Sequence, residues 1–183
     1  MRNRMTNIAL VMFAALTFNT SVSHAQEAKV DKPTVTLPGG STTLQETFDN
    51  WVVTCGIQDS TKICAVTQQQ AQQNGQRILA VEAKPEAGHT RIDIVLPFGL
   101  LVSDGITYQI GDKSTASVAK IKTCFPGGCV STFTLDSEQL KTLRAAPNMI
   151  IKAKVENNPD GATFTIPTKG FLEAYDRLNQ LIK

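Results

Sequence analysis

The sequence lacks the short motifs that mark several common enzyme classes. It contains no Cys-x-x-Cys pair, no Gly-x-Ser-x-Gly turn and no glycine-rich loop followed by Lys-Ser or Lys-Thr. These absences argue against a thioredoxin-like oxidoreductase, an α/β-hydrolase and a P-loop nucleotide-binding protein. The spacing of a calcium-binding loop is absent as well. We therefore expect neither a metal ion nor another cofactor.

A surplus of positive charge is also missing, although the full chain has 18 Lys and Arg residues against 16 Asp and Glu. Cleavage of an N-terminal signal after residue 25 would remove Arg2 and Arg4 and no acidic residue, so the mature chain would have 16 of each. The mature chain has no local cluster of Lys and Arg. Such a neutral chain gives no reason to expect nucleic acid as a partner.

No apolar run is long enough to cross a membrane. The N-terminal run covers eleven residues, 8–18, whereas a membrane-spanning helix needs roughly 20. This run follows Arg2 and Arg4 and precedes small and polar residues that end at Ala25. The layout is typical of a secretion signal cleaved after Ala25. We predict that residues 1–25 are a signal peptide, that the mature protein is periplasmic, surface-located or secreted, and that it has no transmembrane segment.

The remaining sequence divides into a short linker and one domain. Residues 26–43 are rich in Pro, Gly, Thr and Lys and have no apolar period, which predicts a flexible linker. Residues 44–183 alternate between apolar and polar side chains over many short segments, as half-buried strands do. About seven or more short strands with few helices predict an all-β fold, a β-sandwich. The alternating positions are Trp51, Val53 and Cys55; Leu79, Val81 and Ala83; Ile92, Ile94 and Leu96; Ile106, Tyr108 and Ile110; Ser131, Phe133 and Leu135; Ile151, Ala153 and Val155; and Ala162, Phe164 and Ile166.

Two segments depart from this alternation. Residues 136–139 read Asp-Ser-Glu-Gln, which is typical of a capping box at the start of a short internal helix, and Pro147 ends that helix. Near the C-terminus, apolar residues recur at helical spacing and predict an amphipathic helix. We expect this helix to pack over a sheet rather than to bind a partner. Its apolar residues are Phe171, Leu172, Tyr175, Leu178, Leu181 and Ile182.

The sequence has four cysteines, and an exported protein meets an oxidising compartment. Eight residues separate Cys55 from Cys64, and four separate Cys124 from Cys129. Neither spacing is that of zinc-binding cysteines, so we expect no zinc site. Four cysteines allow three pairings, and sequence alone does not choose among them. We favour two local, structural disulfides, because Cys55 and Cys64 lie near the facing ends of adjacent predicted strands and residues 125–128 form a turn.

Few residues of the mature chain could carry catalysis. His89 remains after signal cleavage, but it lies in a predicted turn without a nucleophile or an orienting acid nearby, which favours a solvated side chain. Carboxylates from distant strands could still meet in a hydrolase site, so this alternative stays open. The glutamine-rich segment 68–73 is either a polar recognition face or the solvated end of a strand, and we favour the second. The scattered acids include Asp93, Asp104, Asp112 and Asp136.

A series of motifs runs along the predicted domain. They are Phe48-x-x-Trp51-x-Val53-x-Cys55, then Cys64, Leu96-Pro97-Phe98-Gly99-Leu100 followed by Gly105-Ile106, Cys124-x4-Cys129 with Gly128 before the second cysteine, and Gly170-Phe171-x-x-Ala174. In this order they resemble the invasion-associated locus B family, from about residue 44 to the C-terminus. The resemblance implies an immunoglobulin-like β-sandwich, export to the periplasm or cell surface of an alphaproteobacterium and, in pathogenic members, a role in entering host cells. It supplies no catalytic residues.

Two hypotheses about function follow. The first is an exported, non-enzymatic module that binds an envelope component or a host protein, associated with host-cell invasion in pathogenic relatives. Its candidate surface contacts lie in two loops and are Phe98, Leu100, Phe125 and Pro126. The alternative is a periplasmic hydrolase that uses acidic residues from several strands. A cluster of buried carboxylates in a cleft would favour the hydrolase, whereas an exposed apolar patch would favour the binding module.

Overall fold

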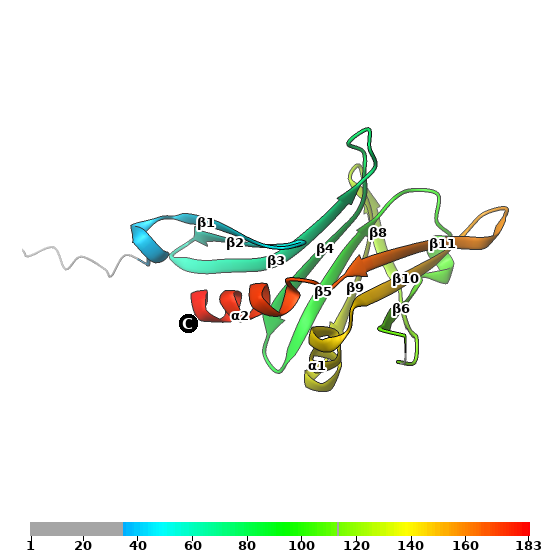
Figure 1. Cartoon of the computed structure of the whole chain (residues 1–183). Coiled ribbons are helices and arrows are strands. Elements are labelled where there is room, and N and C mark those ends of the chain that lie inside the picture. Colours follow the sequence, from blue (N-terminus) through cyan, green and yellow to red (C-terminus); the bar gives the residue numbers. More distant parts are fainter. Residues whose placement is uncertain (1–34, 113) are drawn as a thin grey trace, which may run out of the picture. The chain divides into compact units, whose positions relative to one another are not determined.

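The computed structural model describes residues 35–112 and 114–183. The predicted signal peptide and the first part of the predicted linker, residues 26–34, lie outside these ranges. Within the described residues, the chain forms two antiparallel sheets, two α-helices and two short 3-10 turns. Figure 1 shows the strands of the two sheets and the two helices beside them. The prediction of an all-β sandwich with a short internal helix and a C-terminal helix is confirmed.

The larger sheet, sheet A, has the strand order β1-β2-β3-β4-β5-β9-β8, and sheet B has the order β11-β10-β6-β7. Each of the first four strands pairs with the strand that follows it, so short turns suffice to build most of sheet A. The strands of sheet A are β1 (Thr43–Phe48), β2 (Trp51–Gln58), β3 (Thr61–Ala71), β4 (Arg77–Glu86), β5 (His89–Leu96), β8 (Ile121–Phe125) and β9 (Gly128–Leu135). Those of sheet B are β6 (Ile106–Ile110), β7 (Ser117–Ala119), β10 (Asn148–Val155) and β11 (Asn158–Pro167).

The core lies between the inner faces of the two sheets. Val53, Ile94 and Ile151 are 0% exposed, and burial of one such aliphatic side chain contributes roughly 1.5–3 kcal/mol. The rings of Tyr108 on β6 and Phe133 on β9 stack with 3.8 Å between their centroids, which joins sheet B to sheet A. The alternation seen in the sequence therefore reports which side chains face this core.

The internal helix α1 (Ser137–Ala145) begins with the predicted capping box. The Gln139 backbone N–H donates to Asp136 Oδ1 at 2.8 Å, and the Asp136 N–H donates to Gln139 Oε1 at 3.1 Å. These bonds satisfy two donors that a helix start otherwise leaves open. Leu143 is the fully buried side chain of α1, and the partly buried Leu140 also packs against the core.

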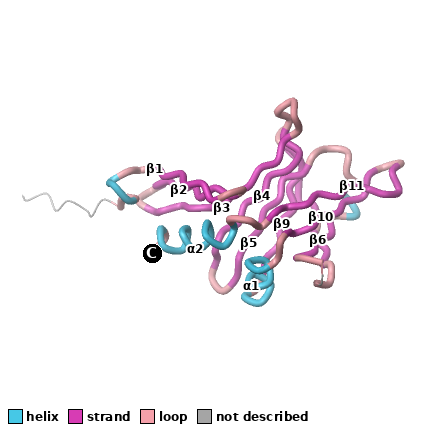
Figure 2. Tube along the Cα trace, in the orientation of Figure 1, coloured by secondary structure: helices cyan, strands magenta, loops and turns pink. Residues whose placement is uncertain are grey.

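The C-terminal helix α2 (Phe171–Leu181) lies along β1, β2 and β3, as Figures 1 and 2 show. The Trp51 indole packs edge-on against Phe171, with 4.9 Å between ring centroids, and its N–H donates to the Pro167 carbonyl at 3.0 Å. Gly170, which precedes the helix, has a φ of 88°, and a Cβ there would collide with the Phe48 carbonyl. Leu172 and Ile182 are exposed, so the buried stripe is narrower than predicted. That stripe consists of Phe171, Ala174, Tyr175, Leu178 and Leu181.

The chain contacts the core before the first strand begins. Leu37 is 2% exposed and belongs to the core. Its N–H donates to the Ser41 carbonyl at 2.9 Å across the 3-10 turn η1 (Pro38–Gly40). Residues 35–43 of the predicted linker therefore include an anchoring side chain, which a composition rich in Pro, Gly and Thr does not reveal.

Candidate functional site

The structure has two disulfide bonds, Cys55–Cys64 and Cys124–Cys129, and all four cysteines are in them. Each bond joins residues that lie directly opposite each other on paired antiparallel strands, β2 with β3 and β8 with β9. The Cα atoms are 4.1 and 3.9 Å apart, respectively. No thiol is left for redox or nucleophilic chemistry, so these cysteines act as structural cross-links.

Three loops meet at one end of sheet A. Strand β5 ends at Leu96, which pairs with Cys129, so the β5–β6 connection starts beside the β8–β9 turn. The start of β4, next to the β3–β4 connection, reaches the same turn, because Arg77 Nη2 donates to the Gly127 carbonyl at 2.7 Å. In Figures 1 and 2 the β3–β4 connection and the β8–β9 turn stand at the top of the view.

We call the exposed part of this end the loop tip and define it by Arg77, Phe98, Phe125, Pro126 and Gly127. Phe98 is 60% exposed and Phe125 is 44% exposed. Pro126 is exposed as well. Three of the four predicted contact residues are thus exposed in two loops at this end of sheet A.

The fourth predicted contact residue, Leu100, has a different environment. It is half-buried, packs against the core and forms an isolated bridge with Val155 of β10. Beyond it the β5–β6 connection turns through the 3-10 segment η2 (Val102–Asp104) toward β6. Leu100 therefore attaches the loop to sheet B and is not part of the loop tip.

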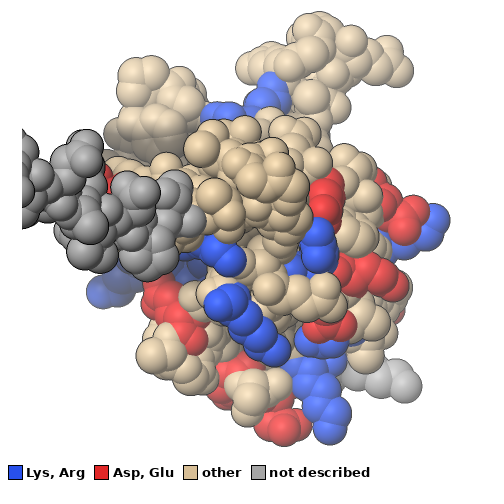
Figure 3. Space-filling view, turned by 90° about the vertical axis from the view of Figure 1, so that its left-hand side faces the viewer, with Lys and Arg blue, Asp and Glu red and all other residues tan. Residues whose placement is uncertain are grey.

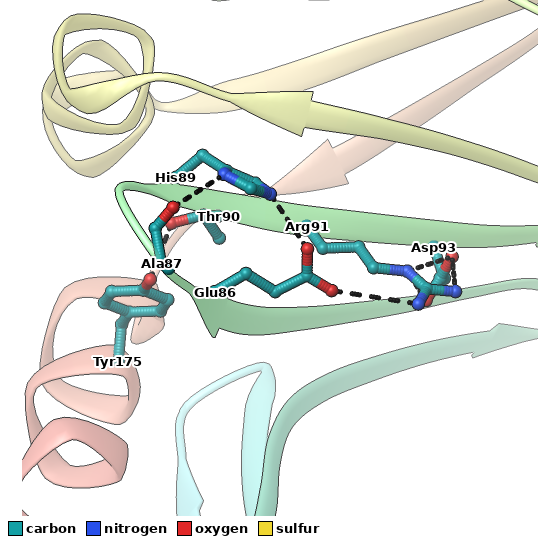
Figure 4. Close-up of polar contacts among 7 residues, drawn as sticks. All are labelled: Glu86, Ala87, His89, Thr90, Arg91, Asp93 and Tyr175. Carbon is teal, nitrogen blue, oxygen red and sulfur yellow. Dashed lines mark hydrogen bonds and ion pairs between the residues drawn. The ribbon is translucent and has the colours of Figure 1, made fainter.

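A charged row lies on the outer face of β4 and β5 (Figure 4). His89 Nε2 is 2.8 Å from Glu86 Oε2, and Arg91 Nη1 is 3.8 Å from Glu86 Oε1. Arg91 also pairs with Asp93, with 3.0 Å between Nε and Oδ2. Asp93 in turn accepts a bond from the Thr132 hydroxyl at 2.6 Å. The hydrogen bonds that Arg91 donates to Asp93 raise the pKa of the Arg91 guanidinium above its ordinary value.

Neighbouring polar groups of this region are paired in the same way. Glu82 and Lys84 form an ion pair at 2.5 Å. On the inner side, the Tyr175 hydroxyl of α2 lies 2.6 Å from Thr90 Oγ1, and both residues are buried. Burial raises the pKa of the Tyr175 hydroxyl above its ordinary value. Because these groups already have partners, the row has the character of a structural network rather than that of an acid and a base awaiting substrate.

The four acids named above as examples of scattered carboxylates lie in different places. Asp93 is in the charged row, Asp104 pairs with Lys154 at 2.9 Å, Asp112 lies beside α1, and Asp136 caps α1. Hydrogen bonds from Lys154 and Ser103 lower the pKa of the Asp104 carboxyl. Over the described part of the chain, no three His, Cys, Asp or Glu side chains are placed to hold a metal ion.

A groove of about 790 Å³ lies between α1 and the β6–β7 connection. Ile110, Ala146 and Pro147 contribute apolar surface, while Glu138 and Lys141 bring opposite charges. The groove combines segments separated by some 30 residues of sequence, so sequence reasoning did not find it. Its size fits a small ligand, but its lining contains neither His nor Cys.

The glutamine-rich segment has a structural role that differs from the expected solvated strand end. Gln68 is 4% exposed, and its Nε2 donates to the Pro167 carbonyl at 3.0 Å. Gln70 Nε2 donates to the Thr165 carbonyl at 2.8 Å. Both carbonyls belong to β11, an edge strand of sheet B. The two amides therefore connect β3 of sheet A to that edge. Their spacing of two residues places both side chains on the same face of β3, but the sequence does not indicate which strand they bind.

The two-sheet fold, the cross-strand disulfides and the paired charges define a disulfide-stabilised β-sandwich domain. Residues 51–179 match the family model described as Invasion associated locus B (IalB) protein. The chain belongs to this family, which confirms the resemblance seen in its motifs.

Relatives of known name agree with this membership. An Invasion protein B homolog of Brucella abortus (strain 2308) is 35% identical over 150 residues, covering 80% of this chain and 86% of the relative. Invasion protein B of Bartonella bacilliformis is 31% identical over 180 residues, covering 95% of this chain and 97% of the relative. The crystal structure of invasion associated protein B from Bartonella henselae superposes with a TM-score of 0.69 at 27% identity, covering 75% of this chain and 96% of that chain.

The family and the disulfides suggest an exported protein, and the names of these relatives do not indicate an enzymatic activity. Among the described residues, no helix has both the length and the apolar character needed to cross a membrane.

Proposed function

We propose that this chain is an exported, non-enzymatic binding module of the bacterial envelope, and that it binds through the loop tip. The observation that carries the proposal is the exposure of Phe98 and Phe125 from neighbouring turns, 60% and 44%. Large apolar side chains that protrude together from a folded domain are typical of interaction surfaces. A rigid β-sandwich presenting such loops fits a binding role.

A periplasmic or cell-surface location fits the same proposal. The predicted signal peptide would direct the chain out of the cytoplasm, and the two disulfides need an oxidising compartment to persist. Because relatives carry the name Invasion protein B, we infer that binding by this chain contributes to contact with a host cell where its source is a pathogen.

The hydrolase alternative finds less support. Hydrolysis by two carboxylates requires one acid that is protonated and one that is free to act as a base or nucleophile. In the charged row, Glu86 and Asp93 are each paired with a basic side chain, and so is the neighbouring Glu82. The acids that the sequence singled out do not converge on one cleft.

The proposal is tested by chemical crosslinking of a tagged chain in intact cells. The double variant Phe98→Ser/Phe125→Ser is compared with the wild type and with Ile63→Ser, a matched control because Ile63 is 45% exposed on β3. We expect the wild type and Ile63→Ser to give the same crosslinked species and the double variant to lose them. Identical species from all three proteins, or turnover of an envelope polymer by the purified chain, would contradict the proposal.

A further inference from the structure

The segments that form the loop tip carry positive charge and no acid. Residues 72–77, 97–103 and 120–128 contain Arg77, Lys120 and Lys122 and neither Asp nor Glu. All three basic side chains are exposed. The next residue along the β5–β6 connection, Asp104, is paired with Lys154. Near the top of Figure 3, where Figure 1 has these loops, the charged side chains in view are blue.

The apolar and basic side chains are also separated in depth. Phe125 lies at the end of β8, and Lys122 lies three residues before it on the same edge strand. At about 3.3 Å per residue, the Cα atom of Lys122 lies roughly 10 Å from that of Phe125 along the strand. Amphipathic elements bury their apolar side about 5–10 Å into the boundary between lipid headgroups and acyl chains. The spacing therefore suits insertion of Phe125 with Lys122 at headgroup level.

The turn that carries Phe125 is held in place from two sides. The Cys124–Cys129 disulfide closes it, and the Arg77 guanidinium binds the Gly127 carbonyl at 2.7 Å. A surface group that is already ordered loses little conformational entropy on binding.

We propose that the loop tip docks on an anionic phospholipid surface, with Phe98 and Phe125 inserted and Lys120 and Lys122 contacting headgroups. This inference rests on the proposed function and names the partner of the same site. Two aromatic side chains that protrude from separate turns suit a continuous, deformable surface better than a shaped protein pocket. Basic residues behind them select for negative charge, and salt weakens that attraction.

The test uses the purified exported chain and sedimentation with two kinds of vesicle. One contains phosphatidylcholine and phosphatidylglycerol at a ratio of about 2:1, and the other contains phosphatidylcholine alone. We expect binding to the anionic vesicles that falls as salt is raised, and little binding to the neutral ones. Phe98→Ser/Phe125→Ser should weaken this binding on the order of tenfold or more.

Two matched controls make the result specific. Ile63→Ser removes an apolar side chain on β3 that is about as exposed as Phe125, 45% against 44%, and it should bind as the wild type does. Lys120→Gln/Lys122→Gln should reduce both the binding and its dependence on salt, whereas Lys141→Gln/Lys152→Gln, which removes two exposed lysines elsewhere, should leave both unchanged. Near-ultraviolet circular dichroism of each variant, dominated by buried Trp51, checks that the domain is folded.

The outcomes separate this inference from the proposed function. Absence of binding to anionic vesicles by the folded wild type, or equal binding by tip and control variants, would overturn the lipid inference. If vesicles do not bind but the loop tip still crosslinks to a protein in cells, the binding-module proposal stands and its partner is a protein. If neither occurs, both fall.

Discussion

At the scale of single residues, one ion pair ties the first strand to the last helix. Arg177 of α2 donates from Nε and Nη2 to the two carboxylate oxygens of Glu46 on β1, at 2.6 and 2.8 Å. These hydrogen bonds hold the pKa of the Glu46 carboxyl below its ordinary value. A bidentate contact of this kind fixes the relative orientation of the two side chains in addition to pairing their charges.

This pair predicts a specific dependence of stability on pH. A carboxyl whose pKa is lowered by folding stabilises the folded state above its unfolded pKa, and that contribution is lost as the pH falls through the folded pKa. We expect Glu46→Gln to lower the free energy of unfolding at about pH 7 and to lose this effect well below about pH 4.3. Urea unfolding at several pH values measures the difference. Glu156→Gln, at an exposed carboxylate, serves as the control, and a Glu46→Gln effect that does not change with pH would contradict the account.

At the scale of secondary-structure elements, α2 completes the core on one side of β1–β3. Leu178 is 0% exposed against the sheets, whereas Leu172 on the same helix is 37% exposed. Leu178→Ala should therefore lower the free energy of unfolding by about 2–5 kcal/mol, and Leu172→Ala by about 0.5 kcal/mol or less. Denaturant unfolding measures both, and equal losses would mean that α2 is packed on another face.

The strand pairs also predict the chemistry of the cysteines. Because Cys55 faces Cys64 and Cys124 faces Cys129 across adjacent strands, peptide mapping without reduction should give these two linked fragments, which a reduced sample should lose. A fragment that links Cys55 to Cys124 would contradict the strand register as well as the pairing.

At the scale of the whole molecule, the sequence predicts those features that depend on neighbours along the chain. Alternation places Ile92, Ile94 and Leu96 on the core face of β5 because side chains of a strand point to opposite faces in turn. The capping box at Asp136 likewise involves residues only three apart. The motifs also sufficed to recognise the family.

Features that depend on distant segments could not be read in this way. Gln68 binds the carbonyl of Pro167, 99 residues away, and nothing near Gln68 in the sequence specifies that contact. The burial of Leu37 and the groove beside α1 likewise depend on segments that are distant in the sequence. At the loop tip, the sequence names Phe98, Phe125 and Pro126 as candidate contacts. It does not name Arg77, which lies at the start of β4 and reaches the β8–β9 turn only through the register of sheet A.

The central claim is that the loop tip is the surface through which this domain binds in the envelope. The most direct test places a photoactivatable side chain at position 98, 125 or 63 in turn and compares the adducts formed in living cells. Positions 125 and 63 have nearly equal exposure, 44% and 45%, at different parts of the domain. The account predicts discrete adducts from positions 98 and 125 and none from position 63. Adducts from position 63 alone, or the same adducts from all three positions, would contradict it.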